Sequence, residues 1–190
     1  MLMTFNQQCL IAIGGNMPSA VGGPAETLRA ALDMLRREGA DVVASSGLYS
    51  TPCFPAGAGP DYVNGAAVLD FTGGARDVLA LLHRVEAAFG RERVRRWGQR
   101  TLDLDLIAVG NQVLPDPETF AIWHDLAPEV QTTAAPDQLI LPHPRMQDRA
   151  FVLVPLADVA PEWVHPVLGK SVRQMLEALP QSDRDAVVLL

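Results

Sequence analysis

The chain has 190 residues, of which 48% are hydrophobic and 19% charged, so it is long enough to fold as one globular domain with a buried core. Its formal net charge of −7 argues against a general nucleic-acid-binding protein, because such proteins are usually basic. No segment approaches the ~18 consecutive apolar residues of a membrane span, and Cys9 and Cys53 are too few for a disulfide framework. We therefore expect a single cytoplasmic domain over residues 1–190.

The first part of the chain alternates strand and helix patterns. Residues 9–13 form a short apolar run that ends at a Gly-Gly-Asn turn, which is typical of a buried strand. Apolar residues between 28 and 35 then recur at helical spacing. Two further strands are predicted over 42–51 and 62–71, separated by the Pro/Gly-rich loop 52–60.

A second helix and a fourth strand complete the same pattern. The helix is predicted over 78–89 and the strand over 102–106. The order β-α-β-β-α-β is that of the ferredoxin-like α+β fold, in which an antiparallel sheet carries helices on one face. Beyond this core we predict a C-terminal extension with a strand over 151–156 and a helix over 171–179.

Residues 115–138 are rich in Pro, Asp, Glu and Thr, and they connect the fourth strand to the Leu-Pro-His-Pro run that follows. A connection of this length is unusual inside a compact domain and is often functional or mobile. We therefore predict a loop insertion over 115–138, and long mobile loops around the core.

Asp103 and Asp105 are the most informative pair of residues in the sequence. Leucine alternates with aspartate from Leu102 to Leu106, which is the period of a half-buried strand. Residues two apart share a face and stand roughly 6.5 Å apart along it, so the leucines point into the core and both carboxylates point outward. Two like charges this close favour bridging cations, and oxygen ligands on a rigid strand suit Mg²⁺ with substrate phosphates. A solvated strand face with two aspartates is the alternative.

An arginine cluster directly precedes these carboxylates, and it favours the metal interpretation. Guanidinium groups bind phosphate in a bidentate manner and stay charged, so clusters of them mark phosphate sites. An aromatic residue and a glycine lie within the cluster. The pattern predicts a polyphosphate–metal site built from the strand and from Arg91, Arg93, Arg95, Arg96, Trp97 and Arg100.

Two other segments carry candidate binding residues. Tyr62 has an aromatic ring that can stack on a flat heterocycle, and the Asn64 amide offers donors and an acceptor for the edge of such a ring. His143 and Arg149 lie six residues apart in one segment, which makes a phosphate contact plausible for both. Taken alone, each of these residues has an ordinary structural explanation.

Five blocks of sequence, in this order, resemble the 6-hydroxymethyl-7,8-dihydropterin pyrophosphokinase family from about Leu10 to Pro166. The string Arg-Trp-Gly-Gln-Arg-Thr-Leu-Asp-Leu-Asp-Leu is the most specific of them. The others are Ala-Ile-Gly-Gly-Asn, Tyr-Ser-Thr-Pro, Pro-Asp-Tyr-Val-Asn and Pro-His-Pro-Arg-Met-Gln-Asp-Arg-Ala-Phe.

The resemblance implies an enzyme that transfers the pyrophosphoryl group of ATP to the hydroxymethyl oxygen of a reduced pterin and releases AMP, in folate biosynthesis. It also implies two Mg²⁺ ions as cofactors and ATP as co-substrate. The expected partners are these small molecules, with no nucleic acid and no membrane, and we expect a monomer.

The family's functional positions carry over to named residues here. Asp103 and Asp105 match the two metal-binding aspartates. The resemblance implies catalytic roles for Arg91, Arg100, Asp103 and Asp105. It implies ATP contacts for Glu86, Arg96, His143 and Arg149. It implies pterin contacts for Thr51, Pro52, Phe54, Tyr62, Asn64, Trp97 and Phe151.

Two other functions share part of this pattern. A nucleotidyltransferase combines a glycine turn with paired aspartates close by, whereas Gly14 and Gly15 lie nearly ninety residues before Asp103. An RNA-binding module shares the expected sheet topology, but an acidic chain with two aspartates in place of a basic surface argues against it. RNA binding without Mg²⁺ would distinguish this reading from Mg²⁺-dependent nucleotide binding.

Overall fold

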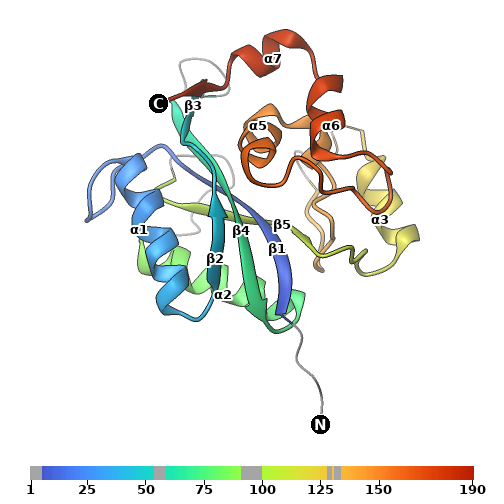
Figure 1. Ribbon diagram of the computed structural model, residues 1–190, viewed down its shortest axis with the longest axis horizontal. Coiled ribbons are helices and arrows are strands. Elements are labelled where there is room, and N and C mark those ends of the chain that lie inside the picture. Colours follow the sequence, from blue (N-terminus) through green and yellow to red (C-terminus); the bar gives the residue numbers. More distant parts are fainter. Residues whose placement is uncertain (1–5, 54–58, 91–99, 128–129, 131–133) are drawn as a thin grey trace.

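The computed structural model describes residues 6–53, 59–90, 100–127, 130 and 134–190 (Figure 1). It is an α+β structure in which an antiparallel sheet has helices packed on it. The elements are β1 (Asn6–Gly15), α1 (Pro24–Arg37), β2 (Asp41–Ser45), β3 (Tyr49–Thr51), β4 (Tyr62–Thr72), α2 (Ala75–Ala88), β5 (Asp103–Val109), α3 (Pro117–His124), the 3₁₀ turn η1 (Met146–Asp148), α5 (Ala150–Val159), α6 (Val172–Ala178), α7 (Gln181–Asp185) and β6 (Val188–Leu189).

The sheet runs in the order β5-β1-β4-β3-β6, and β2 also pairs with β4. Strand β1 is central and pairs along its whole length with β4, from Asn6 opposite Thr72 to Gly15 opposite Val63. Strands β2 and β3 pair with different halves of β4, so both lie on the side of β4 that faces away from β1.

The single strand predicted over 42–51 is two strands, β2 and β3. The break lies at Ser46, whose backbone amide donates to the Ala66 carbonyl while its Oγ accepts from the Ala66 amide at 2.8 Å. Gly47 then turns its own amide to the side chain of Asp158 at 3.1 Å. Contacts with Ala66 and Asp158 therefore interrupt a segment that the sequence pattern predicted to be one continuous strand.

Helices cover both faces of the sheet (Figure 1). Helices α1 and α2 bury their apolar stripes against one face, in a core that includes Ile11, Leu69 and Leu104. Helices α5 and α6 cover the other face, over Leu10 and Val68. Helices α1 and α2 are the two helices that were expected on one face, and helices of the C-terminal extension cover the other face, which the prediction had left without helices.

The strand predicted over 151–156 was wrong, because these residues lie in helix α5. Backbone amides of Val152 and Leu153 both donate to the Arg149 carbonyl, which begins the helix. Val152, Leu153 and Leu156 are buried against the sheet and α6, at the spacing of one helical face. A continuous apolar run is ambiguous between a buried strand and a buried helix, and here the helix buries it.

Helix α3 lies inside the segment predicted as a loop insertion. Asp116 caps it, since its side chain accepts from the Thr119 amide at 2.8 Å. Phe120 is fully buried, and its ring lies 5.7 Å from that of His124 and 5.6 Å from that of His165. This helix is therefore held to the domain by an aromatic anchor.

The final residues of the sequence also form structure that the sequence pattern did not predict. Strand β6 pairs with β3, with Leu189 opposite Tyr49, and the Leu190 amide donates to the Leu48 carbonyl at 2.9 Å. The predicted helix over 171–179 is confirmed as α6. Within the part of the chain that the structure describes, no helix is long and apolar enough to cross a membrane.

Candidate active site

A row of residues crosses the sheet and joins the carboxylates to the second group of candidate residues. Asp103 on β5 lies opposite Gly14 on β1, Gly14 lies opposite Asn64 on β4, and Asn64 lies opposite Tyr49 on β3. Paired residues of neighbouring strands project on the same face. The next residues on that face are Asp105 along β5, and Tyr62 and Thr51 at the other side. These side chains therefore share the face that α5 covers.

The two aspartates lie as the alternating pattern predicted. Leu104 and Leu106 are buried in the core beneath α1 and α2, while Asp103 and Asp105 are half-buried on the opposite face. Opposite Asp105 on that face is Ala12, and opposite Asp103 is Gly14. The neighbouring strand β1 therefore places only a glycine and an alanine beside the carboxylates.

Arg100 already supplies one cation to this pair. Its guanidinium forms a hydrogen-bonded ion pair with Asp103 Oδ2. Burial lowers the pKa of Arg100, but Asp103 and Asp105 together outweigh burial and raise it overall. The neighbouring carboxylates thus stabilise a charged guanidinium just before the first residue of strand β5.

Glu86 lies on the other side of β5 from the aspartate face. It is 2% exposed, and its Oε1 accepts a 2.7 Å hydrogen bond from the backbone amide of Leu104. Leu104 stands between the two aspartates, so Glu86 fixes the strand segment that presents them. This contact assigns Glu86 a positioning role for β5, in addition to the nucleotide contact that the sequence resemblance implies.

Asn64 and Thr51 form a buried polar pair at the far side of the row. The Asn64 amide nitrogen donates to Thr51 Oγ1 at 2.6 Å, and both residues are less than a tenth exposed. Gly14 makes this possible, because a Cβ added there would lie 2.7 Å from Asn64 Oδ1. The absence of a side chain at Gly14 therefore lets the Asn64 side chain lie over β1, toward the carboxylates.

Aromatic side chains flank this polar pair. Tyr62 is half-buried, and burial raises its pKa while the Arg100 charge acts in the opposite direction. Phe151 is the second residue of α5 and is 39% exposed, with the Arg149 guanidinium 5.7 Å from its ring centroid. Pro52 is exposed beside Thr51. An exposed ring on α5 and a half-buried one on β4 therefore border the same face of the sheet.

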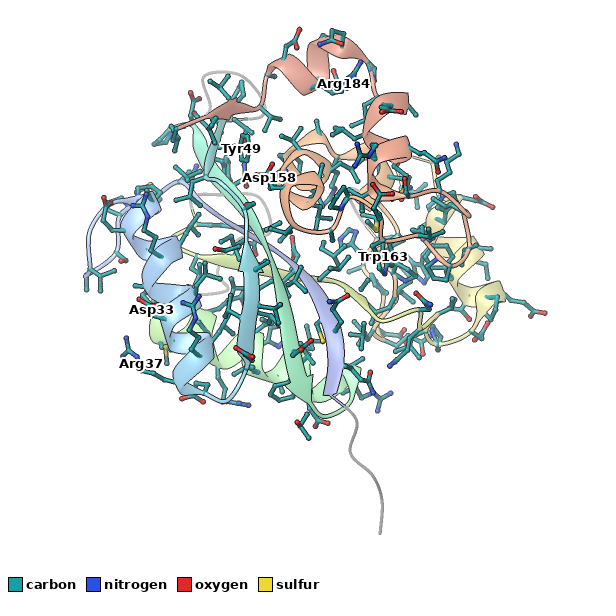
Figure 2. The ribbon with its side chains drawn as sticks, viewed as in Figure 1. Asp33, Arg37, Tyr49, Asp158, Trp163 and Arg184 are labelled. Atoms are coloured by element: carbon teal, nitrogen blue, oxygen red, sulfur yellow. The ribbon has the colours of Figure 1, made fainter. Side chains whose placement is uncertain are left out.

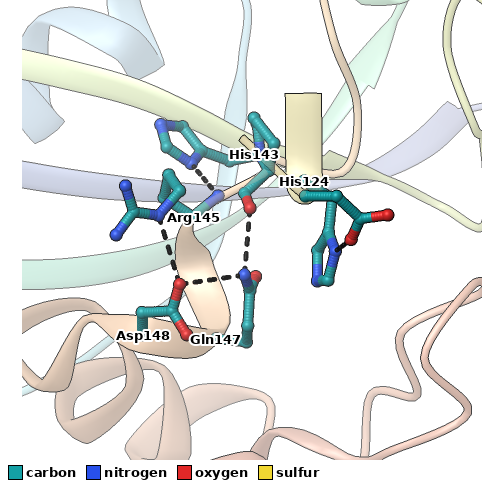
Figure 3. A network of polar contacts seen from close by, with 7 residues as sticks. His124, His143, Arg145, Gln147 and Asp148 are labelled. Atoms are coloured by element: carbon teal, nitrogen blue, oxygen red, sulfur yellow. Dashed lines mark hydrogen bonds and ion pairs between the residues drawn. The ribbon is translucent and has the colours of Figure 1, made fainter. Parts of the chain in front are cut away.

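The segment that leads into α5 runs beside β5. The His143 amide donates to the Ile107 carbonyl at 2.8 Å, and His143 Nδ1 accepts from the Arg145 amide at 3.1 Å (Figure 3). Burial lowers the pKa of His143 to about 3, and Arg149 is the next contribution in the same direction. His143 is therefore neutral at physiological pH, and with Nδ1 as acceptor its proton resides on Nε2.

Arg149 lies close to the carboxylate pair as well. Burial lowers its pKa, whereas Asp105 makes the largest contribution in the opposite direction. Arg145 forms a separate ion pair with Asp148 at 3.1 Å (Figure 3). The structure thus brings His143 and Arg149, predicted from one sequence segment, to the aspartates of another.

The donor set suits a hard divalent cation that is completed by its substrate. Among the described residues, no group of three or more His, Cys, Asp or Glu side chains could hold a metal. Asp103 and Asp105 nevertheless offer carboxylate oxygens on one strand face. Mg²⁺ commonly takes one or two carboxylates and fills the rest of its octahedron with water and phosphate oxygens, so the two residues fit this ion.

Phe54, Arg91, Arg96 and Trp97 are expected site residues that lie outside the described part of the chain. One residue that the sequence pattern assigned only to a turn is placed in the site. Asn16 is 4% exposed and contacts both Arg100 and Pro60. Its only sequence signal is the Gly-Gly-Asn turn, which carries no information about partners so distant.

Solved structures with a similar fold include the wild-type HPPK-DHPS of Plasmodium falciparum, with a TM-score of 0.62 and 14% identity over 93% of this chain. Another is an HPPK-DHPS solved in complex with substrates, with a TM-score of 0.62 and 12% identity. At such identity the likeness shows the fold alone. The chain spans 41% and 43% of the length of those two proteins.

Relatives of similar length are closer in sequence. The chain is 39% identical over 176 residues to the 2-amino-4-hydroxy-6-hydroxymethyldihydropteridine pyrophosphokinase of Pseudomonas aeruginosa, covering 92% of this chain and 93% of that protein. It is 36% identical over 177 residues to the protein of the same name from a Synechocystis species, covering 91% and 78%. The model of the 7,8-dihydro-6-hydroxymethylpterin-pyrophosphokinase (HPPK) family matches residues 10–161. The chain belongs to the HPPK family.

Proposed function

We propose that this chain catalyses transfer of the pyrophosphoryl group of ATP to 6-hydroxymethyl-7,8-dihydropterin, a step of folate biosynthesis. The hydroxymethyl oxygen attacks the β-phosphorus and loses its proton, the bond from that phosphorus to the oxygen shared with the α-phosphorus breaks, and AMP leaves with that oxygen. Family membership and the names of the relatives support this reaction.

The cross-strand row is the observation that carries the proposal. Asp103 and Asn64 lie on opposite sides of Gly14, on one face of the sheet. A heterocycle held at Asn64 and Thr51 would therefore have its substituent directed over Gly14 toward the carboxylates. Positioning of two substrates in this way is the main requirement of phosphoryl transfer, which needs alignment and charge neutralisation more than covalent help.

The phosphate side is formed by cations and one neutral histidine. We propose that Arg149 and Arg100 neutralise the phosphate oxygens, because both guanidinium groups lie in the field of Asp103 and Asp105. His143 then donates from Nε2 to a phosphate oxygen, since its Nδ1 already accepts from Arg145. A neutral donor adds a hydrogen bond there without repelling the arginines.

Asp103 and Asp105 are proposed to hold two Mg²⁺ ions when ATP is bound. The ions would supply charge neutralisation of the phosphates and polarisation of the attacking oxygen. Arg100 must then exchange its contact with Asp103 for one with the phosphates, which links its movement to substrate binding.

The pterin side is formed by aromatic rings and the buried amide pair. Tyr62 and Phe151 are proposed to stack on the two faces of the ring, and Thr51, Pro52 and Asn64 to line its edge. The Asn64–Thr51 hydrogen bond fixes which amide atom Asn64 turns to the ring. Because a site built to hydrogen-bond a heterocycle rejects rings that lack the matching groups, this pair is proposed to select the pterin.

Several further assignments rest on the family resemblance. We propose that Phe54 and Trp97 contact the pterin, that Arg91 and Arg96 contact the phosphates, and that Glu86 faces the nucleotide side. We also propose that the core has the ferredoxin-like arrangement, which the strand order β5-β1-β4 followed by β2 and β3 supports. Residues 115–138 are proposed to be an insertion in one domain, and the protein to be a cytoplasmic monomer.

The test is to follow the nucleotide products by chromatography after incubation with ATP and Mg²⁺, with and without 6-hydroxymethyl-7,8-dihydropterin. AMP that forms only with the pterin, together with a pterin diphosphate, is the expected result. Formation of ADP, or AMP formation that does not depend on the pterin, would overturn the proposal. Omission of Mg²⁺ should abolish the reaction.

A further inference from the structure

Asn16 joins three segments that are distant in sequence. Its side-chain Oδ1 accepts from the Arg100 backbone amide at 2.9 Å, and its own backbone amide donates to the Arg100 carbonyl at 2.9 Å. Its Nδ2 donates to the Pro60 carbonyl at 3.2 Å. The residue is 4% exposed, so water cannot replace these contacts freely.

The segments that Asn16 joins lead to the two halves of the proposed active site. Arg100 precedes β5, and its guanidinium pairs with Asp103. Pro60 lies two residues before Tyr62, which begins β4 and borders the proposed pterin site. The contacts bridge 84 and 44 residues of sequence, so they are tertiary links rather than features of a local turn.

Close approach of the chains at this point depends on Gly15. A Cβ added there would lie 2.6 Å from the Thr101 carbonyl oxygen and 3.4 Å from the Arg100 carbonyl oxygen. The backbone of β1 therefore lies directly against the segment 100–101. The amide of Met17 also donates to the Arg100 carbonyl, at 3.2 Å.

We propose that Asn16 is a positioning residue that sets the separation between the phosphate side and the pterin side of the site. The inference rests on the proposed function. One primary amide satisfies an N–H donor on one segment and a C=O acceptor on the other, which a carboxylate or a hydroxyl of similar size cannot do in the same geometry. The hydrogen bond to Oδ1 (the oxygen arm) orients the Arg100 backbone. The hydrogen bond from Nδ2 (the nitrogen arm) orients the loop that leads to Tyr62.

The two arms can be separated by substitution. Asn16→Asp keeps an acceptor for the Arg100 amide but places a second oxygen against the Pro60 carbonyl. We expect the KM for the pterin to rise about tenfold or more, with kcat within about threefold of the wild-type value. Asn16→Ala removes both arms, and we expect kcat to fall at least about tenfold in addition to the rise in KM.

Asn111→Asp is the matched control, because Asn111 is an exposed asparagine in the turn after β5. It should leave both constants unchanged. Circular dichroism and urea unfolding are measured on each variant, and rates are expressed per folded molecule, so that loss of structure is not counted as loss of positioning.

The outcomes separate this inference from the proposed function. An inactive wild-type protein would overturn the proposed function, whereas the inference is tested only by the ratio of variant to wild type. If the wild type is active and both Asn16 variants keep kcat and the pterin KM within about twofold per folded molecule, Asn16 is not a positioning residue. The same conclusion follows if Asn16→Asp and Asn16→Ala lower kcat equally with no change in KM.

Discussion

The Tyr49 hydroxyl donates a 2.7 Å hydrogen bond to Asp158 Oδ2, which ties strand β3 to the far end of helix α5 (Figure 2). The same carboxylate oxygen accepts from the Gly47 amide at 3.1 Å. Strand β3 carries Thr51 and helix α5 carries Phe151, so one carboxylate links two elements that border the proposed pterin site.

Asp158→Asn should lower the pKa of Tyr49. Burial first, and then the hydrogen bond and charge of Asp158, raise this pKa to about 12 from an ordinary value of 10. A raised pKa stabilises the folded state below pH 10, and this contribution is lost as pH rises toward 12. The amide removes the charge, so the phenol should ionise at lower pH.

Phenolate absorbance measures this change. The chain has two tyrosines, so in a Tyr62→Phe background the signal belongs to Tyr49 alone. Circular dichroism recorded at each pH separates ionisation from alkaline unfolding. An unchanged midpoint in Asp158→Asn would show that burial alone sets this pKa. The variant should also raise the pterin KM, because β3 is less firmly held to α5.

Asp103→Asn and Asp105→Asn should each lower kcat by at least about 100-fold while the fold persists, because each removes a negatively charged ligand of the Mg²⁺ ions that are proposed to neutralise the reacting phosphates. Pterin-dependent AMP release is the measurement. Asp41→Asn, on an exposed position of β2, is the control and should keep full activity. Full activity in either active-site variant would exclude its carboxylate as a metal ligand.

Glu86→Ala should destabilise the protein by about 1–3 kcal/mol, because the buried Leu104 amide loses its acceptor. Glu86→Gln keeps an oxygen at the same position and should cost less. Urea unfolding gives both values, with Glu177→Ala on the exposed face of α6 as a control for a helix glutamate. A raised KM for ATP in Glu86→Gln, with unchanged stability, would instead favour a direct nucleotide contact.

His143 should make stability fall as the solution is acidified. Its pKa is about 3 in the folded protein and 6.5 ordinarily, so between these values only the unfolded chain binds the proton. Stability from this group is complete above pH 6.5 and decreases below it by about 1.4 kcal/mol per pH unit. This amounts to about 2 kcal/mol between pH 6.5 and pH 5.

His143→Asn places an oxygen where Nδ1 accepts from Arg145 but removes the titration. Its urea-unfolding free energy should therefore depend less on pH than that of the wild type. His165, whose pKa is lowered to about 4 chiefly by burial, is present in both proteins and cancels in the comparison. Equal pH dependence in the two proteins would contradict the assignment.

Gly14→Ala should weaken pterin binding more than it weakens folding. The new methyl group would meet Asn64 Oδ1, so the amide must turn away and break its bond to Thr51. We expect a pterin KM raised about tenfold, with the KM for ATP unchanged. Thr51→Val removes the same hydrogen bond without the methyl group on β1. If it gives a normal KM, the hydrogen bond is not what positions Asn64.

The aspartate pair was predictable because its pattern is local. Leucine and aspartate alternate along one strand, and the period of two by itself puts both carboxylates on one face. The helices over 28–35 and 78–89 were equally predictable, because apolar spacing within one helix decides which side is buried. In these cases the spacing of residues within one element is sufficient to predict which side chains share a face.

Errors arose where distant partners decide the structure. The apolar run at 151–156 has no period that separates strand from helix, and its packing over the sheet and α6 selects the helix. Strand β2 ends before Ser46 because the Ser46 hydroxyl accepts a hydrogen bond from the Ala66 amide. The amide of Gly47 donates to the side chain of Asp158, which is 111 residues away in the sequence. Asn16 is the same kind of case, since its partners became visible only in three dimensions.

The pairing of β6 with β3 has a consequence for behaviour at high concentration. Strand β3 is three residues long, and its unpaired side would present backbone donors and acceptors to any extended segment of another molecule. Residues 188–190 occupy that side through their own ladder contacts. The backbone groups on that side of β3 are therefore already paired within the molecule, next to Thr51 of the proposed pterin site, and are not available to an extended segment of another copy.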